Sequence, residues 1–448
     1  MSDLLSIGAS GVRAYKTALD TVGDNIANTG VAGYVRRSAT LAEVAAPAAT
    51  LTARYTESGG GVRVAGVGRA ADMFKAAAVR QSSSDLGRTE TAATWLDRVE
   101  TSLSDTKLSD RLTSFFTSAR TLAADPTSVP QRAVMIEAAN SAALAFQQSG
   151  TSLDRAMTEL DATAQAGVTS LNGLAAQLAK INDGLGRTAS STTTSAQLMD
   201  QRDQVLEQMS ALADIDVQTD DLGRAAVKLG GSTGATLVAG NIEGTVAYSR
   251  NTSGAVSFVV QRAGAAQIVS PSGGALAGVI DGAQRITEAR TALNTIAADF
   301  TQQVNAVQAQ GRDLDGTAGA PIFATGATPT DISVVLTDPR GIAAAAVGGG
   351  ARDSSNLTAL QTVRTSRDFE GRTTALVTAN AAALEQKKLV ADAQSSIRDG
   401  AVAARDSQSS VDLDSEAVDL LRFQQAYQAS SRIIQVARET FQSILEIR

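Results

Sequence analysis

The sequence predicts a mainly α-helical protein with a small β region in its middle. Apolar residues recur with helical periodicity over most of the 448 residues. Alternating apolar residues between Gly, Asn and Asp turns occur mainly within 214–270. Aromatic residues make up only 4% of the chain against 43% hydrophobic residues, which suits closely packed helices rather than a bulky globular core.

The first segment, residues 3–29, has a seven-residue apolar repeat. One series contains Leu5, Val12, Leu19 and Ile26, and the interleaved series contains Gly8, Tyr15 and Val22. Alternating steps of three and four residues define one apolar seam of the coiled-coil type. A turn follows at Asn28, then a linker with Arg36 and Arg37, and a short strand at Val62 and Val64.

A bundle of long helices is predicted between this segment and the C-terminal region. Helices over 70–125 are centred on Phe74, Trp95, Leu96, Val99, Leu103, Leu112, Phe115 and Phe116, and further helices cover 131–184, 196–213 and 275–310. Residues 214–270 form a β flap, and one more strand is expected at 332–336. The glycine runs 59–61 and 348–350 are predicted to be loops or hinges.

The C-terminal region again has apolar residues at seven-residue intervals. One series is Leu376, Ala383, Val390, Ile397, Ala404, Val411 and Val418, and the last helix adds Leu420, Tyr427, Ile434 and Phe441 beside Phe423, Ser430, Ala437 and Ile444. A lone helix cannot bury such a stripe by itself. The two chain ends therefore pair with each other, with another copy, or with both.

These patterns predict three domains. Residues 1–45 with 406–448 form a terminal coiled-coil domain, 46–213 with 271–405 form a mainly helical domain, and 214–270 form the β flap within it.

Composition excludes several classes of function. The chain has no histidine and no cysteine, which removes the commonest general base and the usual zinc ligands. The net charge of −7 disfavours binding to nucleic acid. No stretch reaches the ~20 apolar residues of a membrane span, and no cleavable signal peptide is expected at the start. We expect no catalytic residue, no cofactor and no metal site.

Three polar motifs have ordinary structural explanations. The run Asp200-Gln201-Arg202-Asp203 is interpreted as a surface ion-pair network rather than an acid/base pair. The fragment Asp313–Gly316 lacks the closing Glu of a calcium loop, so a turn is expected. Arg36 and Arg37 are interpreted as a contact between domains or subunits.

Both chain ends carry motifs that resemble one family. The N-terminal residues are Ala18-Leu19-Asp20, Asn25-Ile26-Ala27-Asn28-Thr29 and Gly33-Tyr34, and the C-terminal ones are Val411–Glu416 and Phe423–Ala429. Interior matches include Gly60-Gly61-Val62, Leu198–Asp203, Gly273–Gly278 and Gly311–Gly316. Together these resemble the family of bacterial flagellar hook-associated protein 1. Ala32 stands where the family usually has Pro, and Ser415 interrupts its acidic pair. Residues 320–350 are too short for the outer β domain of longer family members, so this domain is expected to be absent or vestigial.

The resemblance implies a structural axial component of the bacterial flagellum that joins hook to filament and self-assembles through its terminal helices. Implied partners are further copies, the hook protein, a second hook-associated junction protein and an export chaperone on the C-terminal helix. The implied location is extracellular, at the hook–filament junction, after type III export. The residues expected at the assembly interface are Leu5, Val12, Tyr15, Leu19, Val22, Asn25, Ile26, Asn28, Leu420, Phe423, Gln424, Tyr427, Ile434, Phe441 and Ile444.

Two other hypotheses remain. A cytoplasmic helical scaffold or adaptor would explain the heptad repeats but not the paired terminal motifs. An enzyme, such as a peptidoglycan hydrolase fused to axial elements, finds no recognisable pair of catalytic carboxylates in the sequence.

Overall fold

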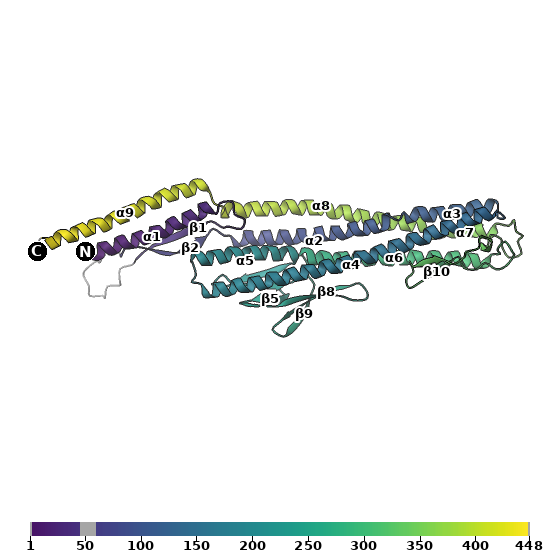
Figure 1. Ribbon diagram of the computed structural model, residues 1–448, viewed down its shortest axis with the longest axis horizontal. Coiled ribbons are helices and arrows are strands. Elements are labelled where there is room, and N and C mark those ends of the chain that lie inside the picture. The colour runs from purple at the N-terminus through teal and green to yellow at the C-terminus, as the bar shows by residue number, and fades with distance from the viewer. Residues whose placement is uncertain (1, 45–59, 447–448) are drawn as a thin grey trace.

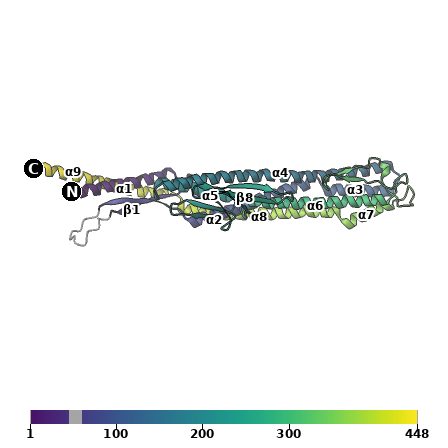
Figure 2. The same cartoon turned by 90° about the horizontal axis from the view of Figure 1, so that it is seen from below.

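The computed structural model describes residues 2–44 and 60–446, which form an elongated molecule. A pair of terminal helices lies at one end, where both chain termini are found, and a long helical body makes up the rest (Figure 1). The body carries its strands along one side, as the view turned by 90° also shows (Figure 2).

The terminal part is built from two helices and a β-hairpin. Helices α1 (Ser2–Ala27) and α9 (Leu413–Glu446) run antiparallel. Strands β1 (Arg37–Glu43) and β2 (Val62–Arg69) pair antiparallel and pack on α1. The predicted strand at Val62 is found, whereas β1 lies in the segment that was predicted to be a linker. The alternation in β1 is short and interrupted by a register shift between Thr40 and Leu41, which hides its period of two.

The body contains seven long or medium helices in its described residues. They are α2 (Met73–Ser104), α3 (Leu108–Ala124), α4 (Val129–Arg187), α5 (Thr193–Leu212), α6 (Gly274–Gln310), α7 (Ser355–Arg367) and α8 (Phe369–Ser409). Asp72 caps α2 by accepting hydrogen bonds from the backbone N–H groups of Phe74 and Lys75. Pro130 sits in the first turn of α4, where its missing N–H costs nothing.

An aromatic cluster fills the core at the end of the body far from the termini. Phe300 is fully buried and contacts Phe115, Phe116, Phe323 and Phe369, with ring centroids 5.1–6.2 Å apart. These rings come from α3, α6, α8 and the short strand β10 (Phe323–Thr325). Five of the ten phenylalanines therefore meet where several helices and a loop region come together.

The β flap packs mainly on α4. One sheet contains β3 (Ile215–Thr219), β4 (Ala225–Leu229), β5 (Ala235–Ala239) and β6 (Ile242–Glu243), and the other contains β7 (Thr245–Arg250), β8 (Val256–Arg262) and β9 (Ala265–Val269). Asn182 of α4 binds the backbone N–H and C=O of Ala225 with its side-chain amide, at 2.9 and 2.8 Å. The observed architecture confirms the predicted fold class.

The far end of the body differs in detail from the prediction. Strand β11 (Ile332–Val334) is found within the expected 332–336, but its partner β10 was not foreseen. A short 3-10 helix, η1 (Pro339–Gly341), follows. Asp313 accepts hydrogen bonds from the backbone N–H groups of Asp315 and Thr317, which confirms the predicted turn.

Three residues predicted to lie in buried seams or cores prove to be exposed. The Phe74 side chain is 80% exposed, although it was assigned to the helical core. Val390 and Ile397 on α8 are 41% and 63% exposed, so the predicted C-terminal heptad series does not form a buried seam there. The series also crosses from α8 into α9, which the structure separates at residues 410–412. Periodicity reveals an apolar stripe but not whether anything covers it.

The predicted domain boundaries stay a prediction. Strand β2 lies beside β1 and α1, whereas those boundaries place residues 62–69 in the helical domain. Among the described residues, no helix is long and apolar enough to cross a membrane.

Replacing Gly282 of α6 by alanine is expected to lower the free energy of unfolding. A Cβ atom there would collide with the indole ring of the buried Trp95, and overpacking costs about 1–3 kcal/mol. The higher helix propensity of alanine offsets only about 1 kcal/mol of this cost. This can be measured by urea unfolding monitored by circular dichroism. The matched control is Gly173→Ala on α4, where a Cβ meets no atom within 4 Å, so that variant should be stabilised. A Gly282→Ala variant as stable as this control would contradict the packing.

Candidate assembly interface

Two glycines bring α1 and α9 into close contact. A Cβ at Gly8 would lie 2.7 Å from Cγ1 of Ile434, and one at Gly11 would lie 2.5 Å from Oγ of Ser430. Both distances are shorter than side-chain contacts allow, so larger residues would force the helices apart. The lack of a side chain at Gly8, one of the heptad positions, therefore allows the close spacing of α1 and α9.

The buried strip on the two terminal helices consists mostly of small and polar residues. On α1 the buried residues are Gly8, Gly11, Ala14, Ala18, Thr21, Val22 and Asn25, and on α9 they are Glu416, Ser430 and Ala437. The predicted series that begins at Leu5 flanks this strip instead of forming its centre. A strip of small residues allows a close approach of the backbones but buries little apolar area.

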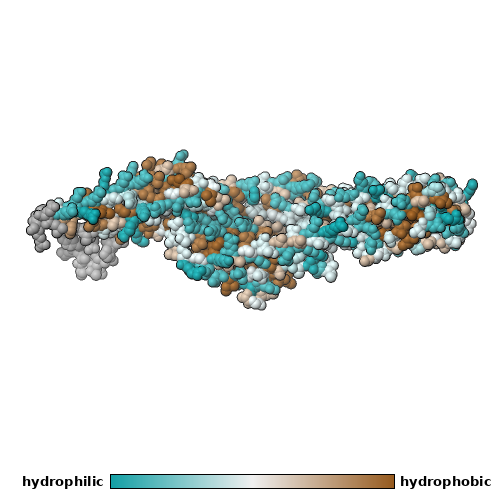
Figure 3. Space-filling model, viewed as in Figure 1, coloured by the Kyte–Doolittle hydropathy of each residue, from teal (hydrophilic) through white to brown (hydrophobic). Residues whose placement is uncertain are grey.

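Most residues predicted at the assembly interface are incompletely covered within the chain. Val22 and Asn25 are buried; Val12, Tyr15, Leu19, Ile26, Asn28, Leu420, Phe423, Tyr427 and Ile434 are half-buried; Leu5, Gln424 and Phe441 are exposed. The side chain of Ile444 lies outside the described residues. Apolar side chains also gather on the first turns of α9 (Figure 3), where Leu413, Val418 and Leu421 are exposed. The role in assembly of the residues predicted at the interface stays a prediction.

Asn25 is the polar centre of the terminal part. Its side-chain amide donates to the backbone C=O of Arg37 at 2.8 Å and to Oε2 of Glu416 at 2.9 Å. Its side-chain oxygen accepts from the Arg37 N–H at 3.0 Å and from the Tyr34 hydroxyl at 2.8 Å. One fully buried residue thus connects α1, the start of β1 and α9, and each contact satisfies a group that would be costly to leave unpaired.

Glu416, which accepts a hydrogen bond from Asn25, also binds the segment that follows α1. Its carboxylate is fully buried and also accepts a hydrogen bond from Nε of Arg36 at 2.6 Å. The Arg36 N–H donates to the backbone C=O of Ser409 at 2.8 Å. The segment after α1 is therefore tied both to the end of α8 and to the start of α9.

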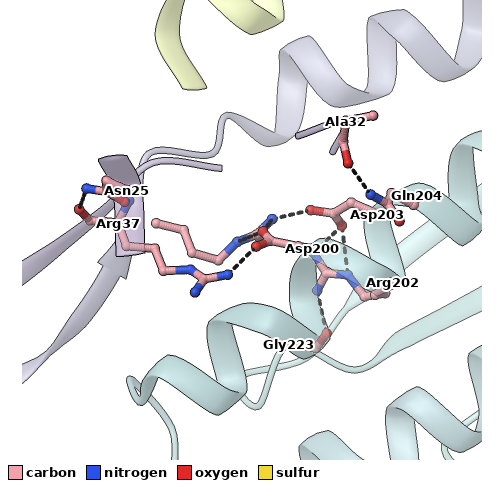
Figure 4. A network of polar contacts seen from close by, with 9 residues as sticks. Asn25, Ala32, Arg37, Asp200, Arg202, Asp203, Gln204 and Gly223 are labelled. Atoms are coloured by element: carbon pink, nitrogen blue, oxygen red, sulfur yellow. Dashed lines mark hydrogen bonds and ion pairs between the residues drawn. The ribbon is translucent and has the colours of Figure 1, made fainter. Parts of the chain in front are cut away.

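A second set of ion pairs fastens this terminal part to the body. Arg37 donates to Oδ2 of Asp200 at 2.7 Å, and Arg69 donates to Oδ1 of the same carboxylate at 2.8 Å. Arg69 also reaches Asp203 at 2.8 Å, and Arg202 pairs with Asp203 at 2.6 Å. Figure 4 shows Arg37 reaching from the strand side towards the carboxylates of α5. We call the cluster of Arg37, Arg69, Asp200 and Asp203 the joint.

Burial changes the acidity of groups at the joint. Burial raises the pKa of the Asp200 carboxyl, and the positive charges of Arg69 and Arg37 act in the opposite direction. Burial raises the pKa of Tyr34 to about 12, with Arg37 opposing. The Tyr34 hydroxyl therefore keeps its proton at neutral pH and can donate to Asn25, while the guanidinium of Arg37 lies 4.7 Å from the centre of its ring.

The joint corrects one prediction and confirms another. The run at Asp200 was expected on the surface, but the side chain of Asp200 is only 9% exposed and holds two buried arginines. The predicted contact between separate parts of the molecule is found for Arg37, which pairs with Asp200 of α5, whereas Arg36 pairs with Glu416 inside the terminal part. Sequence reasoning missed Arg69 and Glu416, although Glu416 ends the C-terminal motif Val411–Glu416.

The glycine runs are not at the joint. Gly348 to Gly350 lie between η1 and α7 at the far end of the body, and Gly61 lies against Ser10 of α1. Gly59 is outside the described residues. The connections between the terminal part and the body are residues 70–72 and 410–412. Any bending of the terminal part against the body must occur there, and not at the predicted hinges.

Comparison with known proteins gives consistent matches. A family model described as flagellar hook-associated protein FlgK helical domain matches residues 95–323, and one described as flagellar basal body rod FlgEFG protein C-terminal matches 403–447. Flagellar hook-associated protein 1 of Salmonella typhimurium is 27% identical over 73% of this chain and 60% of its own length. The protein of that name from Bacillus subtilis is 26% identical over 96% of this chain and 95% of its own length.

A solved structure shares the fold. The flagellar hook junction protein FlgK from Burkholderia pseudomallei matches with a TM-score of 0.50 and 24% identity, over 55% of this chain and 46% of that one. The chain matches only about 60% of the length of the Salmonella relatives.

Proposed function

Because the chain belongs to the FlgK family of flagellar hook-associated proteins, we propose that it is a structural axial component that joins the flagellar hook to the filament. The observation that carries the proposal is the terminal helix pair. Both chain ends meet at one end of an elongated molecule, and most of their large apolar residues remain incompletely covered. Such a pair is completed by neighbouring copies, since uncovered apolar area favours association.

The joint gives the proposal a mechanism. In an axial tube, the α1–α9 pair forms the inner wall and the helical body forms the outer layer. The buried ion pairs from Arg37 and Arg69 to Asp200 transmit force from the inner wall to the body. Buried pairs with defined geometry favour one arrangement over others, so the junction keeps its shape between a bending hook and a stiff filament.

The proposed partners are further copies, the hook protein, a second hook-associated junction protein and an export chaperone that covers α9. The chaperone is proposed because Leu413, Val418 and Leu421 are exposed on α9 and would otherwise drive premature association. The proposed location is outside the cell, at the hook–filament junction, after type III export without cleavage of a signal peptide. We propose a purely structural role without catalysis, as in a family of structural flagellar proteins.

Cell fractionation tests this function. In a strain that lacks the chromosomal gene and carries a plasmid copy, we expect the protein in the sheared flagellar fraction, and motility to depend on it. Recovery only from the cytoplasm, with normal flagella in its absence, would favour the helical scaffold instead.

A further inference from the structure

One side of the contact between the terminal part and the body is firmly held. The ion pairs to Asp200 lie there, and they come from Arg37 and Arg69, which face each other across the β1–β2 hairpin. The backbone N–H of Val67 in β2 also donates to the C=O of Ser191, between α4 and α5, at 2.7 Å. The strand side of the contact is therefore fixed by buried charge and by backbone bonding.

The other side of this contact is a cleft. Residues 28–35, which follow α1, face the start of α2, α5 and the end of α8 across about 750 Å³. Closely packed interfaces contain few voids larger than a water molecule, so this segment is loosely packed on the body. Among the described residues, one hydrogen bond joins the body to it: Nε2 of Gln204 donates to the C=O of Ala32 at 2.8 Å. Figure 4 shows this bond on the side of Asp200 away from Arg37.

The bond from Gln204 is weak and depends on a glycine. Gln204 is exposed, and a hydrogen bond between neutral exposed groups contributes less than it costs to separate a buried ion pair. Gly33 has a φ of +78°, and a Cβ atom there would collide with Nε2 of Gln204. The lack of a side chain at Gly33 therefore lets Gln204 reach Ala32. Under load, this bond breaks before the ion pairs to Asp200.

The charges around the cleft decide in which direction residues 28–35 can move. The charged residues that line the cleft on the body side are mostly acidic: Asp72, Asp200, Asp203, Glu207, Arg405 and Asp406. Residues 28–35 contain no charged residue. Moving this segment further into the cleft would take carboxylates out of water without giving them a cation. Movement away from α5 has no such cost, so it is the favoured direction.

We propose that the terminal part has two positions about the joint. The ion pairs to Asp200 are kept in both positions. The bond from Gln204 to Ala32 is made in one position and broken in the other, in which residues 28–35 lie further from α5. The joint is then a pivot, and Gln204 is the latch that holds one position. The inference concerns a single chain, so its test is independent of the proposed place in the flagellum.

Distances between two spin labels on the purified chain test the latch, because the chain has no cysteine of its own. One label is attached at Lys16→Cys on α1 and the other at Gln81→Cys on α2, where both side chains are exposed. We expect two distances in the otherwise unaltered chain. Gln204→Ala should raise the ratio of the second to the first about fivefold, as expected for the loss of one exposed hydrogen bond. Gly33→Ala should shift the ratio in the same direction by displacing Gln204.

Two matched variants separate the latch from general effects. Gln208→Ala removes another exposed amide that lines the cleft, one turn further along α5. Gly30→Ala imposes the same backbone strain as the change at Gly33, since its φ is +79°, but a Cβ there meets no atom within 4 Å. Both should keep the ratio of the unaltered chain. Labels at Gln81→Cys and Thr101→Cys, both on α2, give the width of one fixed distance. A single distance of that width in every variant, or an equal shift in the matched variants, would overturn the latch.

Discussion

Asp200→Asn is expected to loosen the joint strongly while the helical body stays folded. The Asp200 carboxylate is buried and pairs with Arg37 and Arg69, whose side chains are only 3% and 8% exposed. Removing one member of a buried ion pair costs about 3–5 kcal/mol, because the remaining charge stays buried without a partner. Amide hydrogen exchange at residues 25–44 and 405–420 should report a free energy of local opening lowered by about that amount.

The control for this variant lies one turn along the same helix. Asp203 is 24% exposed and also pairs with Arg69 and Arg202. Asp203→Asn leaves the Asp200 pairs in place, so its effect should be about 1 kcal/mol or less. Fluorescence of Trp95, the single tryptophan, should show the same unfolding of the body in both variants. Equal exchange at the joint in the two variants would show that Asp200 does not fasten the terminal part.

Ile434→Asp is expected to abolish incorporation into flagella. Ile434 is half-buried, and its Cγ1 atom lies against Gly8 of the other terminal helix. A carboxylate there would be desolvated within the pair and again by any neighbouring copy, which costs several kcal/mol unless it is paired. Sheared flagella should contain none of the variant, while circular dichroism and Trp95 fluorescence of the purified chain remain close to those of the parent.

Gln435→Asp is the matched control for Ile434→Asp. It introduces the same charge at the next residue, whose side chain is exposed. This variant should be incorporated at a level near that of the parent. Normal incorporation of Ile434→Asp would show that the α1–α9 contact is not required for assembly, and equal loss in both variants would indicate a general effect of charge on α9.

The helices and the β flap could be predicted because they depend on local patterns. The seven-residue spacing from Leu5 to Ile26 and the 59-residue helix α4 follow from periodicity within single segments. The strands β1 and β10 could not, because each is short and is held by pairing with the next strand rather than by a clear pattern of its own. Short strands gain their stability from pairing rather than from propensity.

The candidate site was only partly predictable for the same reason. Periodicity indicated that both chain ends carry apolar stripes, and of the residues predicted at the assembly interface Val22 and Asn25 are buried within the chain itself. It did not indicate that Gly8 and Gly11 would lie at the centre of the contact. It also placed Phe74 in the core, because a pattern identifies an apolar residue but contains no information about which surface covers it.

By itself, the sequence determined the helical class, the two terminal stripes, the position of the β flap and the absence of histidine and cysteine chemistry. Only the tertiary structure decided that Asp200 meets arginines 163 and 131 residues earlier, and that Asn25 reaches a glutamate 391 residues later. Such contacts depend on how whole helices are placed in three dimensions. Local propensity acts over a few residues, whereas burial and ion pairing are set by whatever the fold brings together.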